Sequence, residues 1–423
     1  MLLVSQIIAE KSRFVAGLEK RGIKDAESVL DEVLALDKKR KSTQQELDQN
    51  LAEANSISRQ IGALMKEGKR DEAEVVKAKT AELRSRNKEL AEIQESTQAA
   101  LKAALYNIPN IPHESVPQGL TDEDNEVIET VGDLPELPAD AAPHWDLIKK
   151  HDIIDFDLGI KITGAGFPVY KGKGARFQRA LINFFLDQAA AAGYGEVQPP
   201  IVVNEASGYG TGQLPDKEGQ MYHIPAENLY LIPTAEVPIT NLYRDVIVPE
   251  DKLPVKHVGF TPCFRREAGS WGAHVRGLNR LHQFDKVEIV QVRKAEESYE
   301  ALTEMCNHVA GLLTKLELPY RILRLCSGDL GFTSVLTYDF EVYSGAQKKW
   351  LEVSSVSNFE TYQANRLKLR YKGTDKKTQL LHTLNGSAMA LPRIMAAILE
   401  NNQDADGIRI PEALVPYTGF DRI

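Results

Sequence analysis

Residues 264–288 combine arginines, a carboxylate and an aromatic ring at spacings that suit phosphate and base binding. Arg265 and Glu267 follow one strand-like run, and Arg280 and Phe284 begin the next; the loop between carries Gly269, Gly272 and Gly277. A planar guanidinium can hold two oxygens of a phosphate or carboxylate at once, and a phenyl face accepts a stacked base. The segment therefore predicts a nucleotide site. Surface arginines paired with Glu267 are the alternative for this segment taken alone.

Two later segments supply groups of the same kind. Small residues from Asn385 to Ser387 lead into an expected helix with Arg393 in its first turns, where an arginine can bind phosphate beside the helix N-terminal amides. Glu352 and Ser355 offer hard oxygen ligands of the kind that Mg²⁺ prefers. The sequence has no Gly-x-x-x-x-Gly-Lys-Ser/Thr loop, and its glycine clusters lack the Rossmann spacing. ATP, if bound, is therefore held by other devices such as these.

Residues 193–203 read as the end of a helix followed by a short strand that carries Pro199 and Pro200. Proline cannot donate a backbone hydrogen bond to a neighbouring strand, so such a strand is normally found at a sheet edge. We expect an edge strand here, and an edge at a subunit interface satisfies the pattern.

Composition limits the class of protein. With 43% hydrophobic and 26% charged residues, the 423-residue chain is typical of a globular protein of at least two domains. Cys263, Cys306 and Cys326 are odd in number and widely spaced, which argues against a disulfide framework or a zinc site and favours a reducing compartment. No 18-residue apolar run and no secretion signal is seen, so we expect neither secretion nor a membrane span. A net charge of −9 does not favour a nucleic-acid partner but says little about any local patch.

Residues 25–105 have a helix-forming composition, with no proline and two glycines. Heptad spacing runs through two parts of this region: first Leu47, Leu51, Ala54, Ser58, Ile61 and Met65, then Val76, Leu83, Leu90 and Thr97. The polar break at residues 66–71 predicts the turn of an antiparallel helical hairpin covering residues 27–105. Each limb of some 35 residues would extend roughly 50 Å, so we expect an arm that projects into solvent. Lys66, Lys69 and Arg70 cluster at its expected tip. A coiled coil that mediates only protein contacts is the alternative.

Three prolines between residues 109 and 117 end the second helix, and an acidic stretch follows. We predict a helical domain at 1–105, a linker at 106–143 and a second domain at 144–423. The second domain mixes helical patterns at 174–192 and 295–316 with strand-like runs at 255–260, 286–292 and 339–342. Because the strands do not alternate regularly with helices, we predict the α+β class with an antiparallel sheet.

In their order along the chain, these segments make the sequence similar to the seryl-tRNA synthetases of the bacterial type over nearly its whole length. Three more stretches carry the resemblance: Ile108-Pro109-Asn110-Ile111-Pro112-His113, Thr211-Gly212-Gln213-Leu214-Pro215 and Pro233-Thr234-Ala235-Glu236. The resemblance implies a coiled-coil arm that binds tRNA, followed by a class II catalytic domain whose antiparallel sheet is flanked by helices. It also implies a homodimer with Pro200 at the interface.

The resemblance further implies the site residues. Catalysis would depend on Arg265, Arg393 and Glu352, and Mg²⁺ would be bound with ATP by Glu352 and Ser355. The ATP site would comprise Arg265, Arg266, Glu267, Arg280, Phe284, Glu352, Val353, Ser354, Ser355 and Arg393. Arg266 stands where many relatives carry a small residue, so its backbone is the expected contact. Serine would be bound by Thr234, Ala235, Glu236, Arg265, Glu288, Asn385 and Ser387.

The implied reaction is ATP-dependent activation of serine, followed by its transfer to the 3′ end of tRNA(Ser), in the cytoplasm and without zinc; tRNA(Sec) is a second candidate substrate. The tip residues Lys66, Lys69 and Arg70 would contact tRNA across the dimer. His282 is expected to be structural. Two alternatives remain open. One is a ligase that loads an amino acid onto a carrier protein, although such relatives lack the arm and bind zinc. The other is a catalytically inactive interaction protein, which retention of Arg265, Glu352 and Arg393 disfavours.

Overall fold

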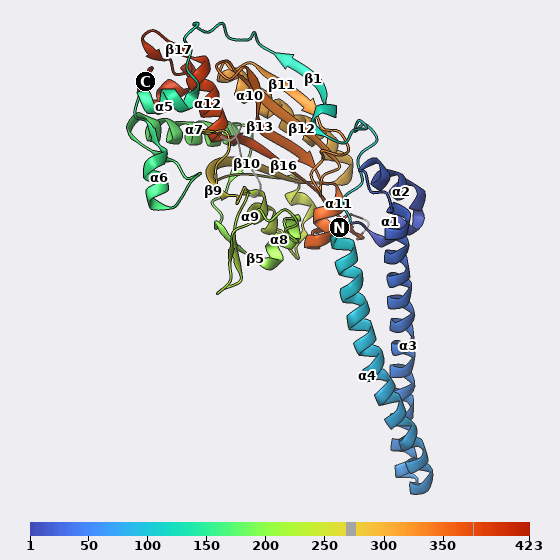
Figure 1. The fold of residues 1–423 in the computed structure, drawn as a ribbon. Helices are drawn as coiled ribbons and strands as arrows, with labels where there is room; N and C mark the ends of the chain where they lie inside the picture. Colours follow the sequence, from blue (N-terminus) through green and yellow to red (C-terminus); the bar gives the residue numbers. More distant parts are fainter. Residues whose placement is uncertain (268–275, 375) are drawn as a thin grey trace. The chain divides into compact units, whose positions relative to one another are not determined.

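The computed structural model describes residues 1–267, 276–374 and 376–423 (Figure 1). Gly269 and Gly272 of the glycine-bearing loop lie outside the described residues. The chain divides into two compact units. The helical unit comprises Leu2–Glu19 and Ile23–Pro109, and the sheet unit comprises Met1, Lys20–Gly22 and Asn110–Ile423.

The helical unit is built around two long antiparallel helices, α3 (Ala26–Lys66) and α4 (Arg70–Tyr106), after the short helices α1 (Val4–Ala9) and α2 (Lys11–Lys20) (Figure 1). Ion pairs join the long helices, with Lys79 Nζ 2.6 Å from Glu53 Oε1 and an Arg86 Nη2 to Glu46 Oε1 distance of 2.7 Å. Along α4 the paired residues increase in number while their partners on α3 decrease, so the two helices are antiparallel. Gly68, with φ +76°, lies in the turn between them. The predicted helical hairpin is confirmed.

The heptad prediction holds for α4 and is half wrong for α3. In α4, Val76 and Leu83 are half-buried and Leu90 and Thr97 are buried, as predicted. In α3, the predicted seam residues Leu47, Ala54 and Ile61 are half-buried, but Leu51, Ser58 and Met65 are exposed. Buried Ile57 and half-buried Leu64 take the inward positions instead. Ile57 and Leu64 lie three residues after Ala54 and Ile61, where the sequence pattern predicts a step of four. A helix seam alternates steps of three and four residues, and the sequence alone does not say which step comes first.

An eight-stranded sheet organises the sheet unit, in the order β1-β11-β12-β13-β16-β10-β9-β4. Its neighbouring strands pair antiparallel except for β4 and β9, which are parallel. The strands are β1 (Glu126–Val131), β4 (Gly195–Glu196), β9 (Val255–Phe264), β10 (Gln283–Arg293), β11 (Tyr320–Arg324), β12 (Leu336–Ser344), β13 (Lys349–Asn358) and β16 (His382–Ala390). The predicted α+β class with an antiparallel sheet is confirmed.

Two local features of the sheet differ in detail from the sequence-based expectation. The edge position expected for the proline-bearing strand is occupied by β4, but β4 has two residues and Pro199 and Pro200 follow it outside any strand. The stretch expected to be a linker contributes β1 at the opposite edge, paired with β11. Its acidic, exposed residues match the pattern of an edge strand, which can face solvent along one side.

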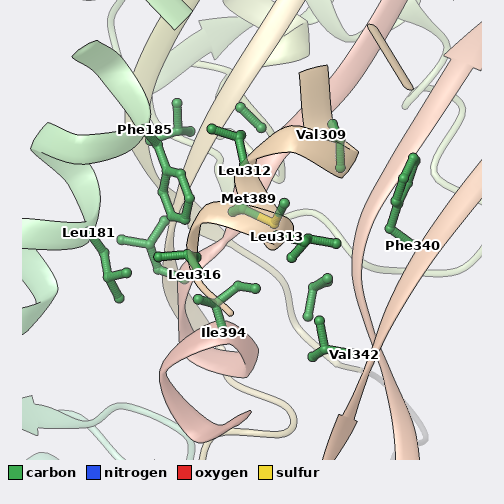
Figure 2. Packing of buried hydrophobic residues seen from close by; sticks show 14 of the residues in the cluster. Leu181, Phe185, Val309, Leu312, Leu313, Leu316, Phe340, Val342, Met389 and Ile394 are labelled. Atoms are coloured by element: carbon green, nitrogen blue, oxygen red, sulfur yellow. The ribbon is translucent and has the colours of Figure 1, made fainter. Parts of the chain in front are cut away.

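Three helices pack on the sheet and close the main core: α7 (Gly172–Ala191), α10 (Ser298–Lys315) and α12 (Leu391–Asn401). Figure 2 shows Leu181 and Phe185 of α7 directed toward Leu312 and Leu316 of α10, with Phe340 of β12 on the other side. Burying such side chains contributes about 1.5–3 kcal/mol each. Since α12 begins directly after β16, this core fixes the direction in which the first turn of α12 presents Arg393.

Smaller elements surround this frame. The helices are α5 (His144–Lys150), α6 (Phe156–Ile162), α8 (Glu205–Thr211), α9 (Glu236–Asn241), α11 (Thr361–Leu367) and α13 (Val415–Thr418), with 3-10 turns η1 (Asp122–Asp124), η2 (Glu250–Lys252), η4 (Ala295–Glu297) and η5 (Glu412–Leu414). The short strands are β2 (Ile154–Asp155), β3 (Val169–Tyr170), β5 (Val202–Asn204), β6 (His223–Ile224), β7 (Leu229–Leu231), β8 (Ile247–Val248), β14 (Arg370–Lys372), β15 (Thr378–Leu380), β17 (Gln403–Asp404) and β18 (Gly407–Ile408). Among the described residues, no helix combines the length and apolar character needed to cross a membrane.

Candidate active site

A pocket of the sheet unit lies where β10, β13, β16 and the start of α12 meet the residues that follow β9. It brings together most of the predicted ATP-site residues: Arg265, Glu267, Arg280, Phe284, Glu352, Val353, Ser354 and Arg393, with Ser387 of the predicted serine site. Leu278, Asn279, Leu281, Lys286, Ala390 and Pro392 complete the lining. Residues more than 120 positions apart in the sequence thus share one concave surface.

Three arginines in this pocket are held by identifiable partners. The Arg265 guanidinium lies 5.3 Å from the centre of the Phe284 ring, so cation and aromatic face are stacked. Arg280 forms an ion pair with Glu267. Arg393 donates from Nη1 to the Glu352 carbonyl at 2.7 Å, leaving its charge directed into the pocket. Such planar, multiply directed donors suit phosphate oxygens.

Arg266 is placed differently from its neighbours. Its backbone N–H donates to the Gln220 carbonyl at 2.9 Å, and the residue is not part of the pocket lining. Alternation along an extended chain explains this, since consecutive side chains point to opposite sides and Arg265 takes the inward direction. Arg266, expected in the ATP site through its backbone, is therefore not among the residues that the structure brings into this pocket.

Glu352 and Ser355 share a face of β13 because of a β-bulge. Glu352 pairs with Glu341 and Ser355 pairs with Asp339, although the two β13 residues are three apart and their β12 partners two apart. The extra residue reverses the alternation, so both oxygen-bearing side chains point the same way. Asp339 belongs to this face, and burial together with the nearby Glu352 carboxylate raises its pKa. The Glu352 carboxylate lies 3.6 Å from Arg393 Nη1, whereas Ser355 bonds Asp339 and is not part of the pocket lining. A carboxylate and a hydroxyl on one face are oxygen donors of the kind that a magnesium ion takes.

A second cluster, largely buried, adjoins the pocket along β10. Lys286 donates from Nζ to Thr234 Oγ1 at 2.8 Å and lies 2.5 Å from Glu288 Oε2. Asn385 Nδ2 donates to the other Glu288 oxygen at 2.9 Å. The Glu288 side chain exposes 1% of its surface, so its charge is compensated by these two neighbours rather than by water. A carboxylate, a hydroxyl and an amide thus converge around the Lys286 ammonium and the Glu288 carboxylate.

Glu236 lies in the same cluster, at the start of α9. Gln363 Nε2 donates to its Oε1 at 2.6 Å. Burial raises the pKa of Glu236 to about 7, the Gln363 hydrogen bond opposes that shift, and the Glu288 charge adds to it. A cationic ligand placed beside Glu236 would favour its ionised form. Ala235, next to Glu236, is fully buried.

Sequence reasoning missed Lys286, Gln363 and Asn279. A signal existed for Lys286, because Phe284, Lys286 and Glu288 alternate along a strand and must point to one face. Gln363 carried no signal, since it lies on α11, far along the chain from Glu236. His282, expected to be structural, forms a hydrogen bond of 2.8 Å between its Nδ1 and Tyr222 Oη, and its ring stacks on that of Phe167.

The predicted tRNA-contacting residues lie at the end of the helical hairpin. Lys66 is the last residue of α3 and Arg70 the first of α4, with Lys69 between them, and all three are exposed. Lys69 Nζ lies 3.0 Å from Glu67 Oε2, a surface ion pair worth little by itself. These cations are accessible to a polyanion.

Comparison with known proteins defines the class first. Residues 222–402 match the model of the tRNA synthetase class II core domain (G, H, P, S and T), and residues 1–112 match the seryl-tRNA synthetase N-terminal domain. The sheet unit, with its antiparallel sheet and arginine-lined pocket, is that of a class II aminoacyl-tRNA synthetase, a ligase that binds ATP.

Full-length relatives then identify the family. A serine–tRNA ligase of Salinibacter ruber is 50% identical to this chain, and the match covers 100% of this chain and 99% of the relative. A serine–tRNA ligase of Akkermansia muciniphila is 47% identical, again with 100% of this chain and 99% of the relative covered. The solved structure of seryl-tRNA synthetase from Pyrococcus horikoshii complexed with ATP superimposes with a TM-score of 0.92 at 34% identity, covering 100% of this chain and 99% of that one. The chain belongs to the seryl-tRNA synthetase family.

Proposed function

We propose that the chain activates serine with ATP to give seryl-adenylate and then transfers serine to the 3′ end of tRNA(Ser). The observation that carries this proposal is the face of β10. Phe284, Lys286 and Glu288 alternate along it, so one strand directs an aromatic ring into the arginine-lined pocket and a carboxylate into the adjoining buried cluster. A nucleotide in the first space and a small amino acid in the second would lie in contact.

For ATP, the proposed base contact is the Phe284 ring, with Arg265 stacked on it at 5.3 Å. Arg265 and Arg393 would bind the α- and γ-phosphates from two sides of the pocket. Arg280 and Glu267 would orient the remaining groups, and Val353 and Ser354 would line the floor through β13. Arg266 would support the site only through its backbone hydrogen bond to Gln220.

Magnesium would be held by Glu352 and Ser355, which the β13 bulge turns to one face. When bound, the ion would neutralise phosphate charge that the arginines leave uncompensated. Asp339 on the same face has its pKa raised by burial and by the Glu352 carboxylate, so a cation bound there would favour its ionised form.

Serine would be recognised by the buried cluster. Thr234, Ala235 and Glu236 would surround its ammonium group, and Glu288, with Asn385 and Ser387, would bind its hydroxyl. Arg265 would hold its carboxylate near the α-phosphorus. A site built to bond a hydroxyl rejects alanine by up to ~10⁴-fold or more, because the buried Glu288 would lose a partner. No editing step would then be required against alanine.

The chemistry would take place in two displacements. The serine carboxylate attacks the α-phosphorus and pyrophosphate leaves; the 3′-terminal ribose hydroxyl of tRNA then attacks the carbonyl of the mixed anhydride, and AMP leaves. Neither displacement requires a protein nucleophile. Arg265 and Arg393 would act by positioning the reacting groups and by neutralising the charge that develops on the phosphorus oxygens.

The tRNA would be bound by the helical unit. Lys66, Lys69 and Arg70 at the hairpin end offer phosphate contacts, and in a homodimer the acceptor end would enter the partner subunit's site. tRNA(Sec) is a second proposed substrate. Three free cysteines fit a reducing compartment, and we propose the cytoplasm.

Pyrophosphate exchange with each of the 20 amino acids tests the function. Exchange is expected with serine and up to ~10⁴-fold or more less efficiently with alanine. Exchange that prefers another amino acid, or none in the presence of serine, would overturn the assignment.

A further inference from the structure

Beneath the ATP pocket lies a buried hydrogen-bonded group that none of the proposed roles uses. It consists of His144 at the start of α5, Glu400 near the end of α12, and Ser344 and Gln347 at the β12–β13 turn. His144 and Glu400 both have fully buried side chains, and their Nδ1 to Oε1 distance is 2.7 Å. Buried charges are rare unless they are compensated, and this one has several partners.

Glu400 is saturated with donors from three directions. Its Oε1 accepts from the His144 backbone N–H at 2.9 Å, from His144 Nδ1 and from Gln347 Nε2 at 2.8 Å. Its Oε2 accepts from Ser344 Oγ. Although burial raises the carboxyl pKa, the His144 and Ser344 hydrogen bonds lower it by more, so the net shift is downward. Glu400 is therefore an anionic anchor that fixes both the imidazole and the turn.

The other ends of these side chains reach the backbone that follows the glycine-bearing loop. His144 Nε2 accepts from the Leu278 N–H at 2.9 Å, so the proton of the ring must be on Nδ1, where it is donated to Glu400. Gln347 Oε1 accepts from Asn279 Nδ2 at 2.9 Å. Leu278 and Asn279 both line the ATP pocket.

A glycine makes this approach possible. Gly277 has φ +66°, and a Cβ at this position would lie 2.3 Å from His144 Nε2. Any larger residue would push the imidazole away from the Leu278 N–H. One residue earlier, the Arg276 guanidinium lies 4.8 Å from the centre of the Trp145 ring, next to His144 in sequence. Residues 276–279 are thus held along their length by the first turn of α5 and by the β12–β13 turn.

The group ends on a proposed phosphate clamp. Arg393 Nε donates to the Asn279 carbonyl at 3.0 Å while its Nη1 bonds the Glu352 carbonyl. The backbone of Asn279 therefore sets the plane of the Arg393 guanidinium. If residues 278–279 shifted, Arg393 would lose the Asn279 carbonyl and keep only its contacts with Glu352.

We propose that His144, Glu400 and Gln347 are positioning residues for ATP, which hold Leu278 and Asn279 in place and through the Asn279 carbonyl orient Arg393. This inference rests on the proposed function, since it assigns ATP to the pocket. These residues touch neither substrate, and no proton transfer is assigned to them. Their effect is expected on ATP use rather than on serine binding, because the serine cluster has its own partners in Thr234, Gln363 and Asn385.

Serine-dependent pyrophosphate exchange with the full chain, with ATP and serine varied in turn, tests this. Gln347 lies in a turn, so Gln347→Ala removes the bridge to Asn279 without touching a regular element. We expect its KM for ATP to rise about tenfold with KM for serine unchanged, below the ~10²-fold that a 1 Å misplacement can cost. Glu400→Ala should have a larger effect of the same kind, and Glu400→Gln should recover most of it because the amide oxygen still accepts.

The matched control is Gln403→Ala. Gln403 also bonds near this group, to both backbone groups of Ala142 and to the Glu400 carbonyl, but it does not contact residues 276–279. The Gln403→Ala substitution should lower the melting temperature and leave KM for ATP at the wild-type value. The proposal is overturned if Gln347→Ala leaves KM for ATP within twofold of wild type, or if Gln403→Ala raises it equally. A wild-type enzyme without serine-dependent exchange would instead overturn the proposed function.

Discussion

Replacing Glu236 by glutamine is expected to stabilise the free protein above neutral pH while weakening its binding of serine. The carboxyl is buried and raised in pKa to about 7 from 4.5, chiefly by burial. Its Oε1 accepts from Gln363, a bond that a glutamine oxygen can also accept. The substitution therefore removes the ionisation and leaves the shape of the site nearly unchanged.

The size and sign of the effect follow from the two pKa values. Between pH 4.5 and 7 the unfolded carboxyl has lost its proton and the folded one retains it, so stability falls as the pH rises through this window. At about 1.4 kcal/mol per pKa unit, the cost reaches about 3 kcal/mol above pH 7. Glutamine has no proton to lose, so the variant escapes this cost; the two proteins should be equally stable near pH 4.5 and differ most at pH 8.

Serine binding should show the opposite dependence. If the ammonium of serine requires ionised Glu236, KM for serine in the exchange assay should rise about tenfold per pH unit below the pKa. Glu236→Gln should raise KM at pH 8 and remove the slope, and KM for ATP over the same pH range is the control. Denaturant midpoints of both proteins without serine measure the stability difference. A difference in stability that does not change between pH 5 and 8 would refute the electrostatic reasoning.

Three further predictions concern the proposed substrate contacts. Arg265→Ala should slow exchange by ~10²- to 10³-fold, as for loss of one transition-state donor, and near wild-type exchange would remove Arg265 from the phosphate site. Glu288→Gln should raise KM for serine far more than KM for ATP; equal effects would contradict its place in the serine cluster. Changing Lys66, Lys69 and Arg70 together to alanine should leave pyrophosphate exchange intact and lower tRNA charging. The slope of log tRNA affinity against log salt concentration should become shallower by about 0.9 for each duplex phosphate that is no longer neutralised. If the variant charged tRNA as well as the wild type at every salt concentration, the hairpin end would instead be assigned to protein contacts.

The helical hairpin was the most predictable part of the fold because its information is local. Composition and the break around Gly68 suffice to place two helices and a turn. Which residues of α3 face α4 was harder to predict from the sequence. Leu51 and Met65 are as apolar as Ile57 and Leu64, and only packing against the partner helix decides which of them is covered. Their exposure of 46% and 55% shows that hydrophobic identity alone does not set the inward face of a long polar helix.

In the candidate site, residue types that suit phosphate could be read from the sequence, whereas the groups that control them could not. Arg393 was predicted, but its acceptor at Asn279 lies 114 residues away and is a backbone carbonyl. Glu236 was predicted, but its raised pKa depends on burial and on the Gln363 amide of α11. Backbone acceptors carry no side-chain signature, and burial is a property of the assembled core.

The proposed magnesium site illustrates the limit most clearly. In a regular strand, residues three apart point to opposite faces, so the spacing of Glu352 and Ser355 argues against a shared ligand. The bulge between Glu352 and Ser354 opposite the Phe340–Glu341 step reverses that argument. A second register shift lies at the Val287–Glu288 step of β10, where Val287 pairs with Met389 and Glu288 with Ser387. Both irregularities occur where the proposed ligands of magnesium and serine stand, so the interruptions of the sheet, together with the regular alternation along β10, bring these oxygen atoms together.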